Sequence, residues 1–357
     1  MPGATVRLLY DTVFSDGSEQ GTYRNLELYG ENITFDLNGK TLKTENENSE
    51  INVFGTYTIK NGTLDAQVRF TSYQETGHLT VENVESLKLF LAARKRTLIK
   101  SGKFTYLRTA DCNFTDILDE GKAYYFYNDH VWYGGEYKSS LQNVEVLPAP
   151  VSIGTQPKDV ILGADESGTL SVEAVRSAGF EDKDVTYQWY EVSYEYNVVY
   201  NGAYGWKGEY QFSSGTKIEN ANTSVLTLPD TVGENKYYYC EVTVDGYTVK
   251  SDIAWYRRGV GTPTLEVRQS NPLSICSFVV DPRGRDCVIV LAGYRDGRFA
   301  RMKTVSVDGD AKLFGGTLGE YDFDSETYFD EVRVMVFESL EALKPLCERK
   351  VLDAPEN

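Results

Sequence analysis

Short runs that alternate apolar and polar residues, each closed by glycine or asparagine, fill the first third of the chain. The pair Asn38-Gly39 returns as Asn61-Gly62, 23 residues on, and the run 98–104 repeats the pattern more loosely. The run 78–84 supplies the step between them. Strand-like runs at a fixed step of about 20 residues are typical of a parallel β-solenoid, where each rung buries its apolar side chains against the next. The pattern predicts a solenoid over residues 1–148.

An aromatic pattern marks the middle of the chain. Trp189 lies in an apolar run, and Tyr238 and Cys240 follow, with 51 positions (240 minus 189) between Trp189 and Cys240. This arrangement is that of strands C and F in an immunoglobulin-type (Ig-like) sandwich, with Tyr238 as the tyrosine-corner residue. The run 169–175, which should be strand B, has no cysteine. We therefore expect an Ig-like sandwich over residues 149–257 without the usual disulfide, and with Trp189 packed on aliphatic side chains.

The last segment also reads as strands. The runs 286–294 and 299–307 flank Asp296-Gly297, which is a hairpin signal, and the run 331–337 alternates strictly. These features predict a second β-sandwich over residues 258–357. The fold class predicted for the whole chain is thus all-β, a short solenoid followed by two sandwiches.

Two linkers are expected between these domains. The segment 147–150 contains two prolines, which fix φ and remove backbone donors, so it should be stiff. The segment 257–263 should be the second linker.

All three segments resemble modules of surface proteins from anaerobic Gram-positive gut bacteria. The first is similar to their short right-handed β-helix modules, the second to bacterial Ig-like repeats, and the third to a fibronectin-like terminal domain. The resemblance implies a secreted or cell-surface protein. It also implies that Met1, which no leader sequence follows, is an expression start; the alternative is a gene product that needs no leader. The motifs that carry the resemblance are 6–11, 33–42, 117–125, 141–146, Gln156-Pro157, 187–190, 237–240, 290–294, 302–304, 337–340 and 344–347.

Charge restricts the partners. The chain carries 36 basic and 53 acidic side chains, a net charge of −17, so a phosphate backbone would be repelled and nucleic acid is not an expected partner. Such acidity also keeps a secreted protein soluble. No apolar run is long enough to span a bilayer, so we expect no membrane insertion and a soluble monomer.

Aromatic residues crowd the stretch between predicted strands C and E, which is longer than an Ig domain needs. Tyr, Trp, Asn, Gly and Ser dominate residues 193–212, the composition of antibody-combining sites, in which rigid rings give contact area at low entropic cost. Flat rings also stack on sugars. The alternative is a hairpin whose rings simply cover the sheet. If the stretch is a ligand-binding site, its candidate residues are Tyr194, Tyr196, Tyr200, Tyr204, Trp206 and Tyr210.

Three smaller features have structural interpretations. A second aromatic group at 124–133 lies where the solenoid should end and is expected to cap it. The acidic run 320–326 could offer oxygens to calcium, but it has no calcium-loop motif, and a strand with its acids in solvent is the preferred interpretation. Among five cysteines, a bridge between Cys276 and Cys287 is possible.

The sequence contains few residues that would support an enzyme activity. His78 and His130 are the only histidines, and neither belongs to a nucleophile or metal motif. Solenoids host polysaccharide lyases and glycosidases, and Asp36, Asp65 and Glu82 sit on predicted rungs, yet scattered carboxylates are expected in so acidic a chain. We expect no enzyme activity, no cofactor and no metal.

The function predicted is therefore that of a non-enzymatic, adhesin-like binding protein. It would present the Tyr-rich insertion to a host glycan or a host protein, such as a mucosal glycoprotein or an immunoglobulin. One alternative is a structural decoration protein of a phage virion, and another is a polysaccharide-active enzyme acting on the solenoid.

Overall fold

The computed structural model describes residues 3–15, 25–46, 49–70, 77–91, 97–109, 112–201, 205–269, 275–323 and 329–353, with the backbone alone for residues 87, 198–201 and 205–209. The described part is nearly all β, as predicted. Its helical segments include two single turns of 3-10 helix, η1 (Phe114–Ile117) and η3 (Leu318–Tyr321). None of the helices described has the length and apolar character of a membrane span.

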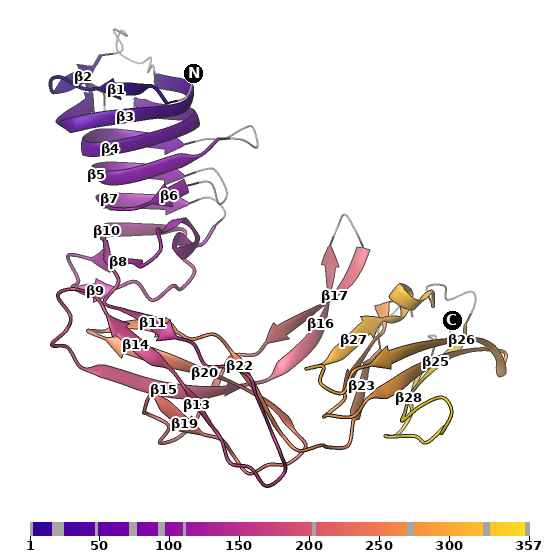
Figure 1. Cartoon of the computed structure of the whole chain (residues 1–357). Helices are drawn as coiled ribbons and strands as arrows, with labels where there is room; N and C mark the ends of the chain where they lie inside the picture. Colours follow the sequence, from indigo (N-terminus) through magenta and orange to yellow (C-terminus); the bar gives the residue numbers. More distant parts are fainter. Residues whose placement is uncertain are drawn as a thin grey trace. The chain divides into compact units, whose positions relative to one another are not determined.

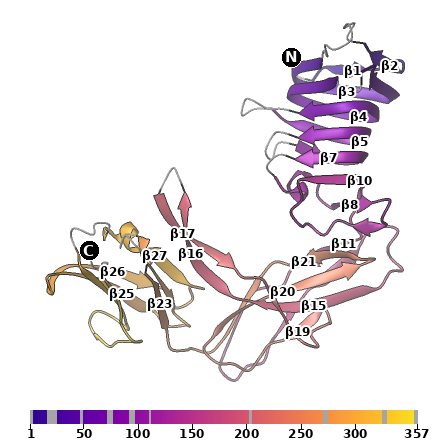
Figure 2. The ribbon, with the colours of Figure 1, turned by 180° about the vertical axis from the view of Figure 1, so that it is seen from behind.

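The first third is a solenoid of stacked strands (Figures 1 and 2). Neighbouring rungs pair in parallel, in the order β1-β3-β4-β5-β7, while β2 pairs with β3 and β6 with β5. This confirms the prediction made from the repeat. The strands are β1 (Thr5–Arg7), β2 (Thr12–Phe14), β3 (Leu26–Thr44), β4 (Glu50–Phe70), β5 (Leu79–Leu91), β6 (Thr97–Ile99) and β7 (Gly102–Thr109).

Asparagines form one corner of the solenoid. Asn38, Asn61 and Asn83 have φ values of 52°, 58° and 51°, a left-handed conformation that asparagine tolerates better than most residues. The Nδ2 of Asn83 donates to Oδ1 of Asn61 at 3.4 Å, and the Nδ2 of Asn61 donates to Oδ1 of Asp36 at 3.3 Å. The repeated asparagine thus turns each rung and ties it to the one before it.

Inside the solenoid, side chains in register stack into a core. Leu42, Leu64, Ser86 and Phe104 occupy equivalent positions on successive rungs, and all four are buried. The serine is the exception in this apolar column, and its Oγ has no hydrogen-bond partner. Serine is a small residue next to the ring of Phe104 in this column. The Ser86 hydroxyl has lost its hydrogen bonds to water on burial, and no protein hydrogen bond replaces them.

Replacing Ser86 with alanine should therefore stabilise the solenoid, by about 1 kcal/mol, because it removes a buried unpaired hydroxyl and almost no volume. The matched control is Ser101→Ala. The Oγ of Ser101 accepts a hydrogen bond from the Asn83 amide at 2.8 Å, so the same change there should lower stability. Thermal unfolding of the two variants checks the sign, and equal destabilisation by both would contradict the argument.

Aromatic side chains close the last rung. The rings of Phe114, Tyr124 and Tyr133 lie edge to face with centroids 6.1–6.2 Å apart, and all three are buried in the solenoid core. The predicted cap is confirmed. The strands here are β8 (Lys122–Phe126), β9 (Val131–Trp132) and β10 (Ser140–Pro148).

The direction of the last strands differs from the parallel repeat. Strand β10 lies between β7 and β8 and is antiparallel to both. The segment 147–150, predicted as a linker, is packed structure: Ala149 and Pro150 are buried, and the Ala149 amide donates to the Gly121 carbonyl at 2.9 Å. The two prolines predicted a stiff segment that lacks backbone donors. They could not show that other parts of the chain pack against this segment.

The middle of the chain is the predicted Ig-like sandwich. Its largest sheet has the order β12-β22-β20-β15-β18, with β21 paired to β20, and the smaller sheets are β11-β14, β13-β19 and β16-β17. The strands are β11 (Val151–Thr155), β12 (Val160–Leu162), β13 (Thr169–Ser171), β14 (Glu173–Arg176), β15 (Val185–Val192), β16 (Tyr194–Asn201), β17 (Gly205–Phe212), β18 (Thr216–Lys217), β19 (Val225–Thr227), β20 (Asn235–Val244), β21 (Tyr247–Lys250) and β22 (Ala254–Arg258).

Trp189 is the centre of this sandwich. Its side chain is fully buried, and its Nε1 donates to the Thr223 carbonyl at 2.9 Å. Leu170 and Val172 are buried on the strands opposite, and Cys240 is a buried free thiol. The core is therefore built without a disulfide, as the sequence predicted.

The C-terminal segment forms two sheets, β23-β24-β27 and β26-β25-β28-β29. The predicted hairpin turns at Asp296-Gly297, where both residues have positive φ, and the predicted strand 331–337 is present. Cys276 and Cys287 are both buried, and no disulfide joins them, so the possible bridge is not formed. The strands are β23 (Thr264–Arg268), β24 (Ser277–Asp281), β25 (Cys287–Arg295), β26 (Arg298–Val307), β27 (Phe314–Thr317), β28 (Glu331–Phe337) and β29 (Lys350–Asp353).

Contacts group the chain into two compact units. One comprises Met1–Ser152, Val175–Asp184 and Thr243–Thr248, and the other comprises Ile153–Ala174, Val185–Val242 and Val249–Asn357. The second unit contains most of the Ig-like sandwich together with the whole C-terminal sandwich.

Candidate binding site at the hairpin cleft

The Tyr-rich stretch forms an antiparallel hairpin of β16 and β17, which extends from the Ig-like sandwich (Figures 1 and 2). Tyr194 pairs with Phe212, and Tyr196 pairs with Tyr210. Because side chains alternate along a strand, residues two apart share a face, and directly paired residues share it across the hairpin. Four rings therefore gather on one face near the base of the hairpin.

Tyr194 is enclosed by other rings. Its centroid lies 4.6 Å from that of Phe212 and 5.1 Å from that of Tyr210, both in stacked geometry, and 5.2 Å from that of Tyr237 on β20. Its side chain is half-buried. This ring anchors the hairpin to the sheet, so it offers a ligand little free surface.

Tyr196 is buried, with 4% of its surface exposed. Its ring packs on β27 of the C-terminal sandwich, where a Cβ added to Gly315 would lie 3.0 Å from the ring. Burial raises the pKa of Tyr196. The candidate residue Tyr196 is therefore not solvent-facing, because the neighbouring sandwich covers its ring.

Of these four residues, Tyr210 and Phe212 are the most exposed, at 38% and 40%. Burial of part of the ring raises the pKa of Tyr210 to about 12, although a hydrogen bond from the Gly315 amide acts in the opposite direction. Of the residues predicted for the site, Tyr210 is the one whose described side chain remains accessible.

The other predicted residues lie further along the hairpin. Tyr200 and Trp206 are paired across it, but their side chains are outside the described residues, as is Tyr204 entirely.

A cleft of about 390 Å³ opens beside the base of the hairpin, between β15–β16, β20 and strands β23 and β24. This volume is in the range of small-ligand sites. Its lining is mostly polar and of both charges: Glu191, Glu195, Glu266 and Asp281 are acidic, Lys236, Arg268 and Arg283 are basic, and Tyr194, Tyr196 and Tyr237 supply rings.

Most charges in this cleft already have a partner. The Nζ of Lys236 lies 2.9 Å from Oε1 of Glu191, and Arg268 donates to Oδ1 of Asn197 at 2.7 Å. Groups held in this way keep a fixed orientation while their remaining acceptors and donors stay free for a ligand. The arrangement suits recognition of hydroxyl groups.

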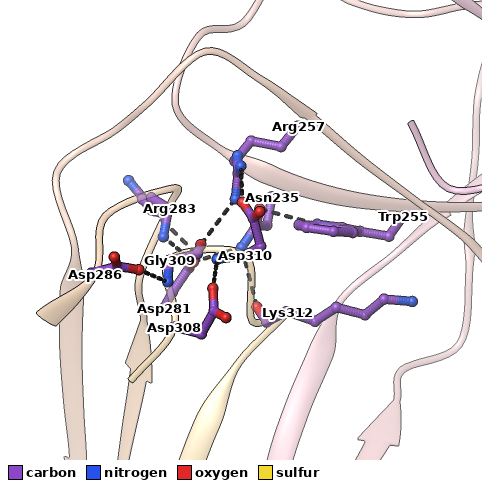
Figure 3. Close-up of polar contacts among 10 residues, drawn as sticks. All are labelled: Asn235, Trp255, Arg257, Asp281, Arg283, Asp286, Asp308, Gly309, Asp310 and Lys312. Atoms are coloured by element: carbon purple, nitrogen blue, oxygen red, sulfur yellow. Dashed lines mark hydrogen bonds and ion pairs between the residues drawn. The ribbon is translucent and has the colours of Figure 1, made fainter. Parts of the chain in front are cut away.

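Asp281 is one of the residues that line the cleft, and Figure 3 shows its contacts with Asn235 and Arg283. Burial raises the pKa of Asp281, and hydrogen bonds from Arg283 and Asn235 oppose that rise. Asn235 donates to its Oδ1 at 2.6 Å, and the Nε of Arg283 lies 3.2 Å from its Oδ2. The carboxylate thus joins β20 of the Ig-like sandwich to β24 of the C-terminal one.

Arg257 makes the second connection between the two sandwiches (Figure 3). It donates to the Gly309 carbonyl at 3.0 Å and to Oδ1 of Asp310 at 2.7 Å, and its guanidinium lies 5.4 Å from the Trp255 ring. Arg257 and Arg258 are buried at the end of β22, so the predicted linker 257–263 begins inside the structure. The junction therefore fixes both walls of the cleft.

Sequence reasoning did not find the C-terminal wall of the cleft. Arg268, Asp281 and Arg283 lie 56 or more residues (268 minus 212) beyond Tyr194–Phe212, in ordinary strand and turn segments. No local signal marks them, since their role depends on how two sandwiches dock.

The solenoid carboxylates considered for catalysis are paired with cations. Asp36 lies 3.2 Å from Arg7, Asp65 3.0 Å from Lys43, and Glu82 4.0 Å from Lys100. The pKa of Asp36 is lowered, mainly by the backbone hydrogen bond from Asn38. These contacts give the three carboxylates structural roles along the rungs.

In the described part of the acidic run considered for calcium, residues 320–323, the chain is not a strand. Glu320 caps η3 by accepting from the Thr317 amide at 2.7 Å, and Asp322 pairs with Arg301 at 3.1 Å. Residues 324–326 lie outside the described part of the chain. Across the described ranges there is no group of three or more His, Cys, Asp or Glu side chains that could hold a metal.

No protein-family model and no curated protein matches this chain. Solved structures of tandem β-sandwiches do. They include a chimeric titin Z1Z2 functionalized with a KLER exogenous peptide from decorin (14% identity, TM-score 0.19, 57% of this chain and 94% of that one). They also include titin domains z1z2 in complex with telethonin (13%, 0.19, 57% and 92%). A third is the fibronectin(III)-like modules of Clostridium thermocellum CbhA (12%, 0.17, 57% and 93%).

At these identities and TM-scores, the matches support no inference about ligand or partner. The assignment to Ig-like and fibronectin-like sandwiches rests on the strand order and cores described above.

Proposed function

We propose that this chain is an extracellular, non-enzymatic binding protein that holds a carbohydrate chain, most simply a host glycan, in the hairpin cleft. The observation that supports this is the combination of two exposed rings, Tyr210 and Phe212, on the hairpin with a polar cleft at its base. The exposed ring surfaces can pack against the apolar face of a sugar. The oriented carboxylates, guanidinium groups and amides of the cleft can bind its hydroxyl groups.

The rigid junction also supports binding. Both walls of the cleft are held by the hydrogen bonds of Arg257 and Asp281, so little order has to be created when a ligand enters. Host proteins, including immunoglobulins, are the second class of partner, since paired rings and arginine also suit protein surfaces.

The test is binding of the whole chain to a glycan array and to a panel of mucosal proteins, followed by titration of the best ligand. The double variant Tyr210→Ala/Phe212→Ala should weaken glycan binding at least about tenfold, because it removes both exposed rings that stack on Tyr194 at the edge of the cleft. The matched control is Tyr137→Ala, which removes a ring that is 75% exposed on the other compact unit.

Thermal unfolding of both variants separates loss of the site from loss of folding. Silence of the wild-type chain on the array and the protein panel would contradict the proposal. So would unchanged affinity of the double variant. If the chain binds a protein on the panel but no glycan on the array, the partner is a host protein and the glycan proposal is wrong.

A further inference from the structure

Strand β26 (Arg298–Val307) is an exposed edge. It is the outer strand of the sheet β26-β25-β28-β29, and its pairing within the described residues is with β25 alone. Phe299 is 60% exposed and Met302 54%. A free strand edge presents unpaired amides and carbonyls to which another extended chain can pair.

The edge is basic in a strongly acidic protein. Residues 295–303 contain four basic side chains and one acidic, a local charge of +3, whereas the whole chain carries −17. Arg301 is paired with Asp322 at 3.1 Å. Arg298 and Lys303 are exposed and make no ion pair with any described residue. Two cations on this edge are therefore free to meet an anionic partner.

Charged residues on an edge strand often serve only to prevent aggregation. That interpretation explains Arg298 and Lys303, but it does not explain the two large apolar side chains beside them. Phe299 and Met302 increase the tendency of an edge to associate, so a purely protective edge would not expose them. Cations and apolar groups together are the combination that a specific partner requires.

We propose that β26 binds an extended acidic peptide segment of another protein, which adds to the sheet as a further strand. Backbone hydrogen bonds would come from the free edge, carboxylates of the peptide would pair with Arg298 and Lys303, and its apolar residues would cover Phe299 and Met302. A second copy of this chain is disfavoured as the occupant because two edges of charge +3 would repel each other. This surface is separate from the hairpin cleft.

The test uses the whole chain and a fluorescein-labelled ten-residue peptide of alternating Glu and Val, followed by fluorescence anisotropy. We expect saturable binding that weakens as salt is raised, because the ion pairs are exposed. A Glu-Pro peptide of equal length and charge should bind at least about tenfold more weakly, since proline cannot donate to the edge. A Lys-Val peptide should not bind.

The protein variant for this test is Arg298→Glu/Lys303→Glu, which should weaken binding of the Glu-Val peptide at least about tenfold by replacing attraction with repulsion. The control Lys158→Glu/Lys217→Glu makes the same change of net charge at exposed sites of the Ig-like sandwich and should leave binding within about twofold. Equal effects of the two variants would overturn the proposal, as would equal binding of the Glu-Pro peptide. Heparin fragments that bind this edge when peptides do not, or self-association in sedimentation, would also overturn it.

Discussion

Replacing Gly55 with alanine is expected to unfold the solenoid. Gly55 has φ +102°, a conformation that side chains rarely adopt, and it pairs with Gly30 on the preceding rung. A Cβ at Gly55 would lie 2.0 Å from the Gly30 carbonyl oxygen, far inside van der Waals contact. Backbone cannot move aside as a flexible side chain can, so β3 and β4 would have to separate.

The cost should exceed about 4 kcal/mol, since backbone strain of about 1–3 kcal/mol adds to the loss of rung pairing. Gly39→Ala is the matched control, because Gly39 also has positive φ (+71°) but nothing within 4 Å of its Cβ position. It should cost only about 1–2 kcal/mol. Urea unfolding followed by circular dichroism measures both, and similar midpoints for the two variants would show that the close approach of Gly30 and Gly55 does not matter.

The second large effect is expected from Arg257→Ala. The guanidinium is 4% exposed and bonds the Gly309 carbonyl and Asp310 on the C-terminal sandwich. Its removal takes away the hydrogen bonds to Gly309 and Asp310, while the Gly309 carbonyl keeps the Gly284 amide as a donor at 3.0 Å. We expect a loss of about 2 kcal/mol together with faster opening of the junction. Hydrogen–deuterium exchange at residues 308–312 is the measurement, because opening of the junction exposes that turn first.

Arg257→Met is the control for packing. Methionine keeps an unbranched apolar side chain over Trp255 but cannot donate, so it separates the contribution of the side-chain stem from that of the hydrogen bonds. If the methionine variant protects residues 308–312 as well as arginine does, the hydrogen bonds are not what joins the two sandwiches. If both variants match the wild-type chain, Arg257 has no such role.

The sequence left two interpretations of residues 193–212 open: a ligand-binding surface, or a hairpin whose rings cover the sheet. The structure has the hairpin, with Tyr196 buried, Tyr194 half-buried and Tyr210 exposed. Tyr196 is buried because a sandwich more than 60 residues further along the chain supplies Gly315, whose missing side chain makes room for the ring. Nothing near Tyr196 in the sequence records that neighbour. The same reason applies to Arg268 and Asp281, which form the far wall of the cleft.

The sequence by itself determined the parts that depend on short-range geometry. Repeated asparagines specify the left-handed corners of the rungs, and Trp189 and Cys240 mark two neighbouring core strands of one sheet. Asp296-Gly297 specifies a tight turn, and the alternation at 331–337 specifies a strand. In each case the conformation follows from residues a few positions apart or from a repeated spacing.

Only the tertiary structure decided the antiparallel direction of β10, the burial of part of each predicted linker, the enclosure of Tyr196 and the docking of the two sandwiches around Arg257. These depend on which surfaces meet after the strands have formed. Burial and the pairing of charges across such contacts are set by residues distant in sequence, and the hydrophobic effect that drives them is not directional. A local pattern therefore shows which face is apolar or aromatic, while the fold decides what covers it.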